Sequence, residues 1–223
     1  MPRMASASPL PAGVVACAWY DIHGQRHDLP LGEVGARIAA DAPGFAWIGL
    51  YEPAEEILER LQQALELHPL AVEDARKAHQ RPKVEAYGEI LFVAMHTAQM
   101  EGSRIAYGET HAFLGRRFLL TVRHGASLSY APVRARLEQE PELLRPGPAM
   151  ALYGVLDFVV DNCAPIVDAL MRGPGFLAAE RYPEITFRLD RLRRISERSA
   201  SVEGRITLRG VTRPTTFAAT VIA

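Results

Sequence analysis

The chain has 223 residues, of which 48% are hydrophobic and 23% are charged, the proportions of an ordinary globular protein with one large core or two small ones. Its net charge of −1 excludes a generic electrostatic attraction to nucleic acid. Its two cysteines, Cys17 and Cys163, form neither a metal-binding cluster nor a disulfide framework, so we expect a reducing compartment.

The first elements predicted along the chain are two strands and a short helix. The opening residues, MPRMASASPLPAG, contain one arginine and no long apolar run, so we expect no signal peptide. Val14–Tyr20 predicts a strand, and a turn follows at His23-Gly24. Leu31–Ala40 predicts a short helix. The aromatic and branched run Phe45–Tyr51 predicts a buried strand.

Helices and strands alternate in the next hundred residues. Helices are predicted from Pro53, with two glutamates in the first turn to suit the helix dipole, and again from Pro69. Ile90–Thr97, apolar on both faces, predicts a central strand. A hairpin is predicted over 111–123 and a helix over 130–140. This alternation favours a layered α/β (α+β) domain.

A long apolar helix is predicted from Ala149 to Met171. It is long enough to cross a membrane, but it contains Asp157, Asp161 and Asp168. Each acid costs roughly 2.5–3.5 kcal/mol at the centre of a bilayer, far more than a leucine or valine returns. We therefore expect no transmembrane helix.

The composition changes after Met171. Residues 1–171 contain 15 basic and 21 acidic residues, whereas residues 172–223 contain 10 and 5. Apolar residues alternate with polar ones over 185–189 and 206–208, and a third apolar run covers 217–222. This pattern predicts a small antiparallel β appendage with turns at Glu203-Gly204 and Arg213-Pro214. Two parts are therefore expected, 1–172 and 173–223.

Acidic side chains on two predicted helices are the candidate metal ligands. At about 100° per residue, Asp157, Asp161 and Asp168 share one side of the long helix. The opposite side is apolar and consists of Leu152, Val159, Ile166 and Leu170. The acid stripe is either a solvated face or a weak divalent-cation surface. Glu73 and Asp74 are adjacent, so their side chains diverge and need a second element to hold one ion.

Motifs for enzymatic chemistry are absent from the sequence. It contains no HExxH, GxSxG, P-loop, GxGxxG or CxxC pattern, so neither an enzyme nor a zinc site is expected. His79, Arg81 and Lys83 form a basic patch around Pro82. Packing of the turn explains this patch better than anion binding does.

A series of six motifs follows the chain from about Val14 to Leu170. The motifs are WIGLYEP (47–53), LHPLAVEDA (67–75), HQRPKVEAYGEILFV (79–93), GETHAFLG (108–115), LLTVRHG (119–125) and LYGVLDFVVDN (152–162). Together they resemble the cytoplasmic domain of the CorA magnesium/cobalt transporter family. The resemblance implies a mixed sheet between helical layers, followed by a long stalk helix. It also implies a pentamer with two transmembrane helices and a GMN motif that selects hydrated Mg²⁺.

The same resemblance implies regulatory metal sites between neighbouring cytoplasmic domains. By motif match the ligands are Glu73, Asp74 and Asp157, with Asp161 a neighbouring candidate, binding Mg²⁺ or Co²⁺ weakly. The sequence has no Gly-Met-Asn triplet, no transmembrane helices and no counterpart of the family's partner acid on the stalk helix. We therefore expect a soluble, cytoplasmic regulatory part of an inner-membrane transporter, unable to conduct ions alone, whose pentamer would need the stalk and pore.

The tail resembles a second family. GPGFLAAERYPEITFRLDRLR (173–193) and VEGRITLRGVTRPTTFAATV (202–221) are similar to the YceI family of lipocalin-like barrels, which are typically periplasmic and bind polyisoprenoid lipids. The similarity covers roughly the middle of such a domain. Two alternatives to a metal-sensing function follow: a soluble isoprenoid-lipid-binding protein, or a gene fusion without selected activity.

Overall fold

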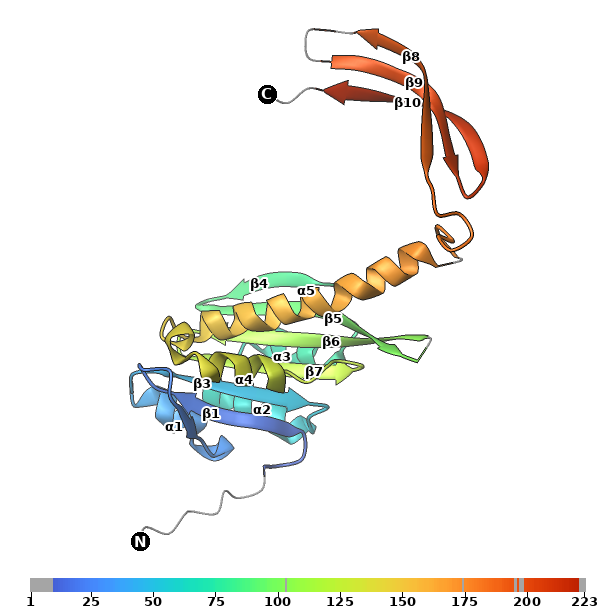
Figure 1. Cartoon of the computed structure of the whole chain (residues 1–223). Helices are drawn as coiled ribbons and strands as arrows, with labels where there is room; N and C mark the ends of the chain where they lie inside the picture. The colour runs from blue at the N-terminus through green and yellow to red at the C-terminus, as the bar shows by residue number, and fades with distance from the viewer. Residues whose placement is uncertain (1–9, 103, 174, 195, 197–198, 221–223) are drawn as a thin grey trace. The chain divides into compact units, whose positions relative to one another are not determined.

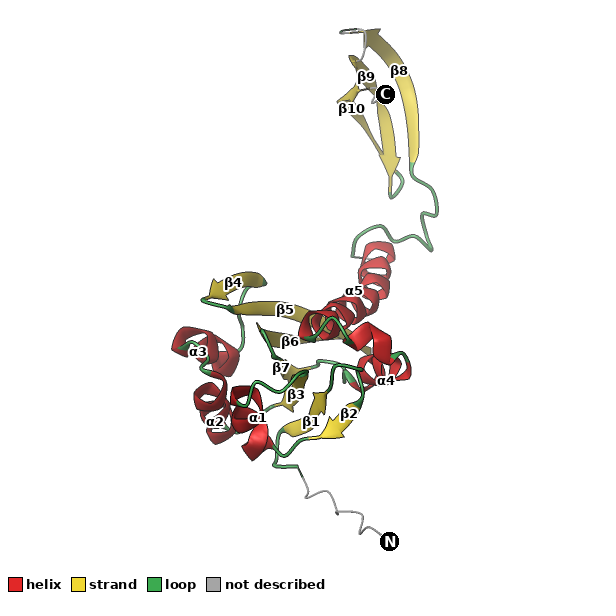
Figure 2. Ribbon diagram, turned by 90° about the vertical axis from the view of Figure 1, so that its left-hand side faces the viewer, coloured by secondary structure: helices red, strands yellow, loops and turns green. Residues whose placement is uncertain are grey.

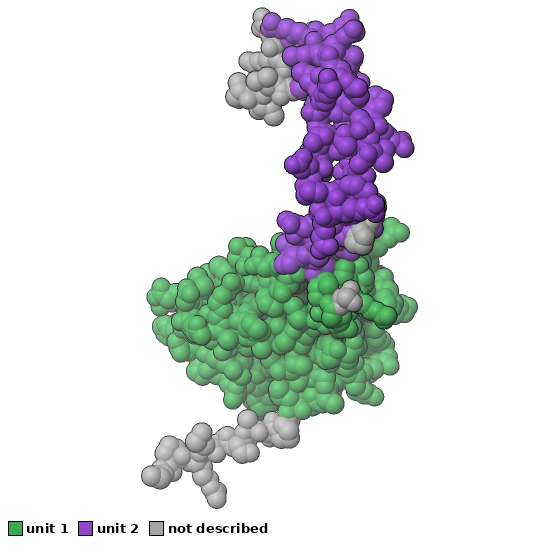
Figure 3. All heavy atoms as spheres, turned by 45° about the vertical axis from the view of Figure 1, so that its right-hand side comes forward, with its two compact units in different colours: residues 1–163 green, residues 164–223 purple. Residues whose placement is uncertain are grey.

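The computed structural model describes residues 10–102, 104–173, 175–194, 196 and 199–220 (Figure 1). The expectation about a signal peptide concerns residues 1–9 above all, which lie outside the described residues. The chain forms two compact units, residues 1–163 and 164–223, shown in green and purple in Figure 3. Each unit is described by itself.

A seven-stranded mixed sheet forms the centre of the first unit, in the order β2-β1-β3-β7-β6-β5-β4. Strands β3 and β7 run parallel, and the other neighbouring pairs described in this sheet are antiparallel. The strands are β1 (Val14–Tyr20), β2 (Arg26–Asp28), β3 (Phe45–Tyr51), β4 (Lys83–Tyr87), β5 (Ile90–Glu101), β6 (Arg104–Gly115) and β7 (Phe118–Gly125).

Helices cover both faces of this sheet, which confirms the predicted layered α/β class. One face carries α1 (Val34–Ala39, preceded by the 3₁₀ turn Leu31–Glu33), α2 (Glu55–Leu65) and α3 (Pro69–Lys77). The other face carries α4 (Ala131–Gln139), the 3₁₀ turn Pro141–Leu144 and α5 (Pro148–Arg172). Figure 2 shows the two groups of helices on opposite sides of the sheet.

The alternation of side chains along β3 explains why this strand is apolar throughout. Ala46, Ile48 and Leu50 pack into the core beneath α1–α3, whereas Phe45 and Trp47 pack into the core beneath α4 and α5. Successive residues of a strand point to opposite faces of its sheet, so a strand that is covered on both sides needs apolar residues at every position. The predicted buried strand is confirmed.

Helix α5 is the one helix in the described part of the chain that is long and apolar enough to cross a membrane, with a mean hydropathy of 1.4 over its most apolar stretch. The core helix of a soluble protein can meet the same two criteria of length and composition. Ala151, Leu152 and Val155 of this helix are buried in the core that also contains Trp47. Its first turns are therefore occupied in packing against the sheet.

Three features of the sheet differ from the sequence-based expectations. β5, expected to be central, lies next to the edge strand β4. β4 was not predicted, and it forms because residues 83–87 pair with β5 across a tight turn. β2 was not predicted either, because its three residues are all exposed and show no apolar alternation.

The second unit contains the predicted antiparallel appendage, a three-stranded sheet in the order β10-β9-β8. Its strands are β8 (Thr186–Arg194), β9 (Ser199–Leu208) and β10 (Val211–Thr220). Residues Val221 and Ile222, expected to continue the last strand, lie outside the described residues.

Both turns predicted within this tail are wrong. Glu203 and Gly204 lie in the middle strand and pair on both sides, while Arg213 and Pro214 pair with β9. The β9–β10 turn lies instead at Arg209-Gly210, where both residues have positive φ, 53° and 74°. Pro214 is tolerated because β10 is an edge strand, where a missing N–H need not break a ladder.

Candidate metal centre

Both members of the acid pair on α3 are engaged with lysines; Glu73 is exposed and Asp74 is half-buried. Glu73 lies 2.5 Å from Lys77 one turn later, and Asp74 Oδ2 accepts a hydrogen bond of 2.7 Å from Lys83 Nζ. Lys83 also lies 2.9 Å from Glu85 Oε2. The hydrogen bond to Asp74, joined by that to Glu85, raises the pKa of Lys83. A cation that binds Asp74 therefore competes with the Lys83 ammonium for this carboxylate.

A polar cluster beneath α3 fixes this helix on the sheet. His124 contacts the carbonyl of Ala75 through Nε2, at 2.8 Å, and the carboxylate of Glu52 through Nδ1, at 3.0 Å. Glu109 accepts a hydrogen bond of 3.1 Å from the backbone of Gln80, just after the helix. These contacts hold both ends of the 75–80 segment to β6 and β7.

His111 lies in the same cluster and is fully buried. Its ring stacks on Phe92, and its Nε2 lies 3.4 Å from Glu109 Oε2. Burial lowers the pKa of His111 to about 4, so the ring is neutral near pH 7. The sequence predictions missed this cluster, because only Glu109 and His111 share an element, β6, while His124 comes from β7 and Glu52 from the segment after β3.

The acids on α5 are less restrained. Asp157 Oδ2 lies 3.5 Å from Arg136 Nη2 on α4, and Asp161 is exposed with no ion pair among the described residues. Asp168 pairs with Arg172 at 2.9 Å, one turn later on the same helix.

The apolar face expected on this helix is shorter than predicted. Leu152 and Ile166 are 5% exposed and Val159 is half-buried, but Leu170 is 51% exposed. The buried side of α5 therefore ends before Leu170.

The two acid pairs do not meet within one chain. Glu73 and Asp74 lie on the helical layer that covers one face of the sheet, and Asp157 and Asp161 lie on the layer that covers the other (Figure 2). Across the described residues, no group of three or more His, Cys, Asp or Glu side chains could hold a metal ion. Each helix by itself presents only the one or two carboxylates that a hydrated Mg²⁺ ion commonly accepts.

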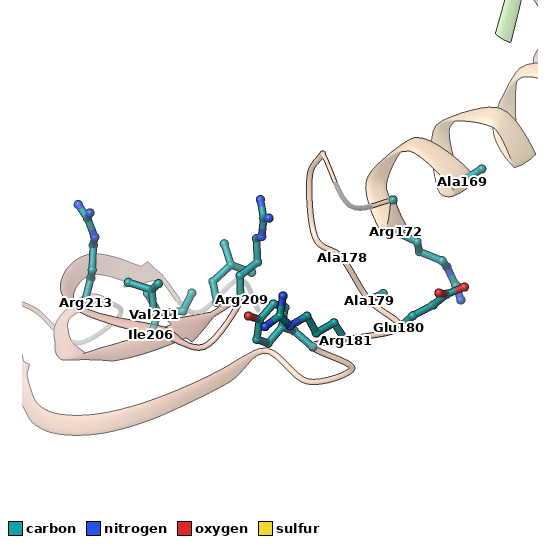
Figure 4. A pocket seen from close by; sticks show the side chains of 13 residues that line it. Ala169, Arg172, Ala178, Ala179, Glu180, Arg181, Ile206, Arg209, Val211 and Arg213 are labelled. Atoms are coloured by element: carbon teal, nitrogen blue, oxygen red, sulfur yellow. The ribbon is translucent and has the colours of Figure 1, made fainter. Parts of the chain in front are cut away.

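A separate cavity of about 1,180 Å³ lies within the second unit (Figure 4). The end of α5, the following turn and the β9–β10 hairpin line it. Its walls combine apolar side chains, such as Ile206, with the guanidinium groups of Arg181, Arg209 and Arg213. Such a lining suits an apolar molecule with an acidic or polar end.

Residues 43–207 match the family model described as "CorA-like Mg2+ transporter protein". The chain belongs to this CorA-like family. The matched range extends past Met171, so it includes part of the tail. The similarity of the tail to the YceI family stays a prediction.

Relatives of the chain include named metal ion transporters. It is 31% identical over 121 residues to the "Putative metal ion transporter YfjQ" of Bacillus subtilis, covering 54% of this chain and 37% of that protein. It is 26% identical over 110 residues to the "Cobalt/magnesium transport protein CorA" of Thermotoga maritima, covering 48% of this chain and 31% of that protein. The chain thus spans well under half the length of these relatives.

The fold is that of a CorA soluble domain. The soluble domain of CorA from Methanocaldococcus jannaschii superposes with a TM-score of 0.52 at 17% identity, covering 78% of this chain and 67% of that structure. The expected mixed sheet between helical layers is confirmed.

Proposed function

We propose that this chain is the cytoplasmic, Mg²⁺-sensing part of a CorA-type divalent metal ion transporter. The observation that carries the proposal is the position of the two acid pairs in a domain of this family. Glu73 and Asp74 on α3, and Asp157 and Asp161 on α5, lie at the surface on opposite sides of one sheet. Acids on two opposite sides of a domain support a ring in which the α3 acids of one copy face the α5 acids of the next.

Such an arrangement explains how the ion acts. Without a cation, carboxylates that face each other across the contact repel and loosen it. A bound Mg²⁺ ion cancels this repulsion and accepts oxygens from both copies while it keeps part of its water shell. Lys77 and Lys83 compete with the ion for Glu73 and Asp74, so the affinity is low, as suits a sensor of abundant Mg²⁺. Co²⁺ would act in its place.

Titration of the chain with Mg²⁺ tests the proposal, with the melting temperature and the mass in solution as readouts. We expect Mg²⁺ to raise both, and we expect Asp74→Asn and Asp157→Asn each to abolish most of the response. Glu89→Gln, which changes an exposed acid outside both pairs, is the matched control. If neither readout responds up to about 10 mM Mg²⁺, well above the weak millimolar range of protein sites, the sensing function is wrong.

A second candidate function is the binding of an isoprenoid lipid by the tail. The 1,180 Å³ cavity of the second unit, with its apolar and arginine lining, favours it. Ile206→Asp would place a charge in the apolar wall and should abolish binding of a fluorescent isoprenoid. Retention of binding in this variant would contradict a site in this cavity.

A further inference from the structure

A cavity of about 310 Å³ lies on the α4 side of the main sheet. It opens between strands β1, β2, β3 and β7 and one side of α4, which lie together in Figure 2. Two small residues at neighbouring positions, Ala16 and Gly49, contribute to its lining and leave space above the sheet. At about 30 Å³ per water molecule, the volume corresponds to roughly ten waters, enough for a small ligand.

Arg123 of β7 lines this cavity and is only 6% exposed. Its Nη1 donates a hydrogen bond of 2.8 Å to the carbonyl of Ser127, and its guanidinium lies 4.9 Å and 5.6 Å from the ring centroids of Tyr51 and Tyr130. Among the described residues no carboxylate lies within ion-pair distance of it. Buried charges in proteins are normally paired, so this guanidinium lacks the counter-charge that its burial calls for.

Arg134 of α4 lines the same cavity and is 8% exposed. It donates hydrogen bonds to the Tyr20 hydroxyl at 2.7 Å and to the Trp47 carbonyl at 3.2 Å. The Tyr20 hydroxyl in turn donates to Glu138, whose carboxylate also lies 3.9 Å from Arg26. Glu138 therefore lies within ion-pair distance of Arg26 and reaches Arg134 only through the Tyr20 hydroxyl, and no carboxylate of the described residues pairs with Arg123.

The charges around the cavity sum to an excess of positive charge. Arg26, Arg123 and Arg134 contribute three guanidinium groups, and Glu138 contributes the one carboxylate of the lining. Arg26 is also paired, at 3.2 Å, with Asp28 outside the lining, so one positive charge remains in excess. Helix α4 lines the cavity along one side, through Ala131, Arg134, Ala135 and Glu138, and Ser129 lies just before it.

We propose that this cavity binds a small oxyanion, a phosphate or a phosphate monoester, between the guanidinium groups of Arg123 and Arg134. A guanidinium has five N–H donors in a planar fork that matches the oxygens of such an anion. The hydrogen bonds described above use one group of Arg123 and two of Arg134, so donors remain for the ligand.

Isothermal titration calorimetry of the full chain tests this site, with inorganic phosphate and glycerol 3-phosphate as probes. Divalent cations are left out, which separates the result from metal sensing, and chloride keeps the ionic strength constant. We expect at least one probe to bind and to raise the melting temperature. Binding of phosphate alone would indicate the free ion as the ligand class, and binding of glycerol 3-phosphate alone would indicate a monoester.

Substitutions of arginine test the role of Arg123 and provide a matched control. Arg123→Met keeps much of the packing of the buried side chain and should weaken binding at least tenfold, while Arg123→Lys, which keeps the charge but not the fork, should weaken it several-fold. Arg60→Met removes an exposed arginine from α2, on the other face of the sheet, and should leave binding unchanged. The proposal is overturned if neither probe binds, or if Arg123→Met binds a probe as tightly as Arg60→Met and the unmodified chain do.

Discussion

Replacement of His111 should change how the stability of this domain depends on pH. The ring is fully buried, and burial lowers its pKa from the ordinary 6.5 to about 4. As the pH falls below 6.5, the unfolded chain takes up a proton at this residue while the folded chain stays neutral. Unfolding is therefore increasingly favoured until the pH reaches about 4, where the folded form also becomes protonated.

The size of the effect follows from the two pKa values. At about 1.4 kcal/mol per tenfold change in proton affinity, the interval from 6.5 to about 4 corresponds to a loss of about 3 kcal/mol in the free energy of unfolding. Acidic side chains also titrate in this range. The quantity to measure is therefore the difference between the unmodified chain and His111→Leu at each pH.

Urea unfolding at intervals from pH 7.5 to 4 measures this difference, with the fluorescence of the buried Trp19 and Trp47 as the signal. We expect the unmodified chain to lose about 3 kcal/mol relative to His111→Leu as the pH falls. His23→Leu, at an exposed histidine, should show no such trend. If the free energies of unfolding of the unmodified chain and His111→Leu differ by the same amount at every pH, within about 0.5 kcal/mol, the reasoning is refuted, because the shifted pKa requires a larger change.

Three further substitutions test the turn, the buried network and the acid pair. Gly24→Ala places a Cβ 2.0 Å from the Pro141 carbonyl oxygen at a φ of +75°, so it should lower the free energy of unfolding in urea by at least about 2 kcal/mol. Gly88→Ala, also at positive φ but with open space around the new Cβ, should lower it by about 1 kcal/mol. Tyr20→Phe leaves Nη1 of buried Arg134 without its partner and should lower the free energy of unfolding by about 1–3 kcal/mol in the same assay. Tyr153→Phe, at an exposed tyrosine, should leave it almost unchanged. Equal effects of the two substitutions would contradict a stabilising Tyr20–Arg134 hydrogen bond. Lys83→Met removes the ammonium that competes for Asp74 and should raise the Mg²⁺ affinity several-fold in calorimetry. Arg60→Met should leave the affinity unchanged. An unchanged affinity in Lys83→Met would argue against Asp74 as a ligand.

Strands covered on both faces were predictable because apolar residues at successive positions indicate burial on both sides. β1 was predicted with its observed bounds, and so was β3, since every residue of β3 except Tyr51 is buried. β2 was not predictable, because three exposed residues carry no apolar signal. The turns predicted in the tail failed because a glycine or a proline marks a turn only when no neighbouring strand pairs with it.

In the candidate sites, too, features within one segment were predictable and features that depend on packing were not. The acids on α3 and α5 were found from helical spacing and motifs, because those features lie within one segment. The sequence could not place the two pairs on opposite sides of a sheet, since that depends on which face each helix covers.

The sequence by itself determined the layered class, most of the helices and strands, the acidic candidates and the family. Only the tertiary structure decided which side chains meet. Arg134 binds Tyr20 and Trp47, which lie 114 and 87 positions away. Arg123 lines the same cavity from β7. Local patterns record whether a residue is buried or exposed. The neighbours of a buried charge come from long-range packing, which the order of apolar and polar residues does not specify.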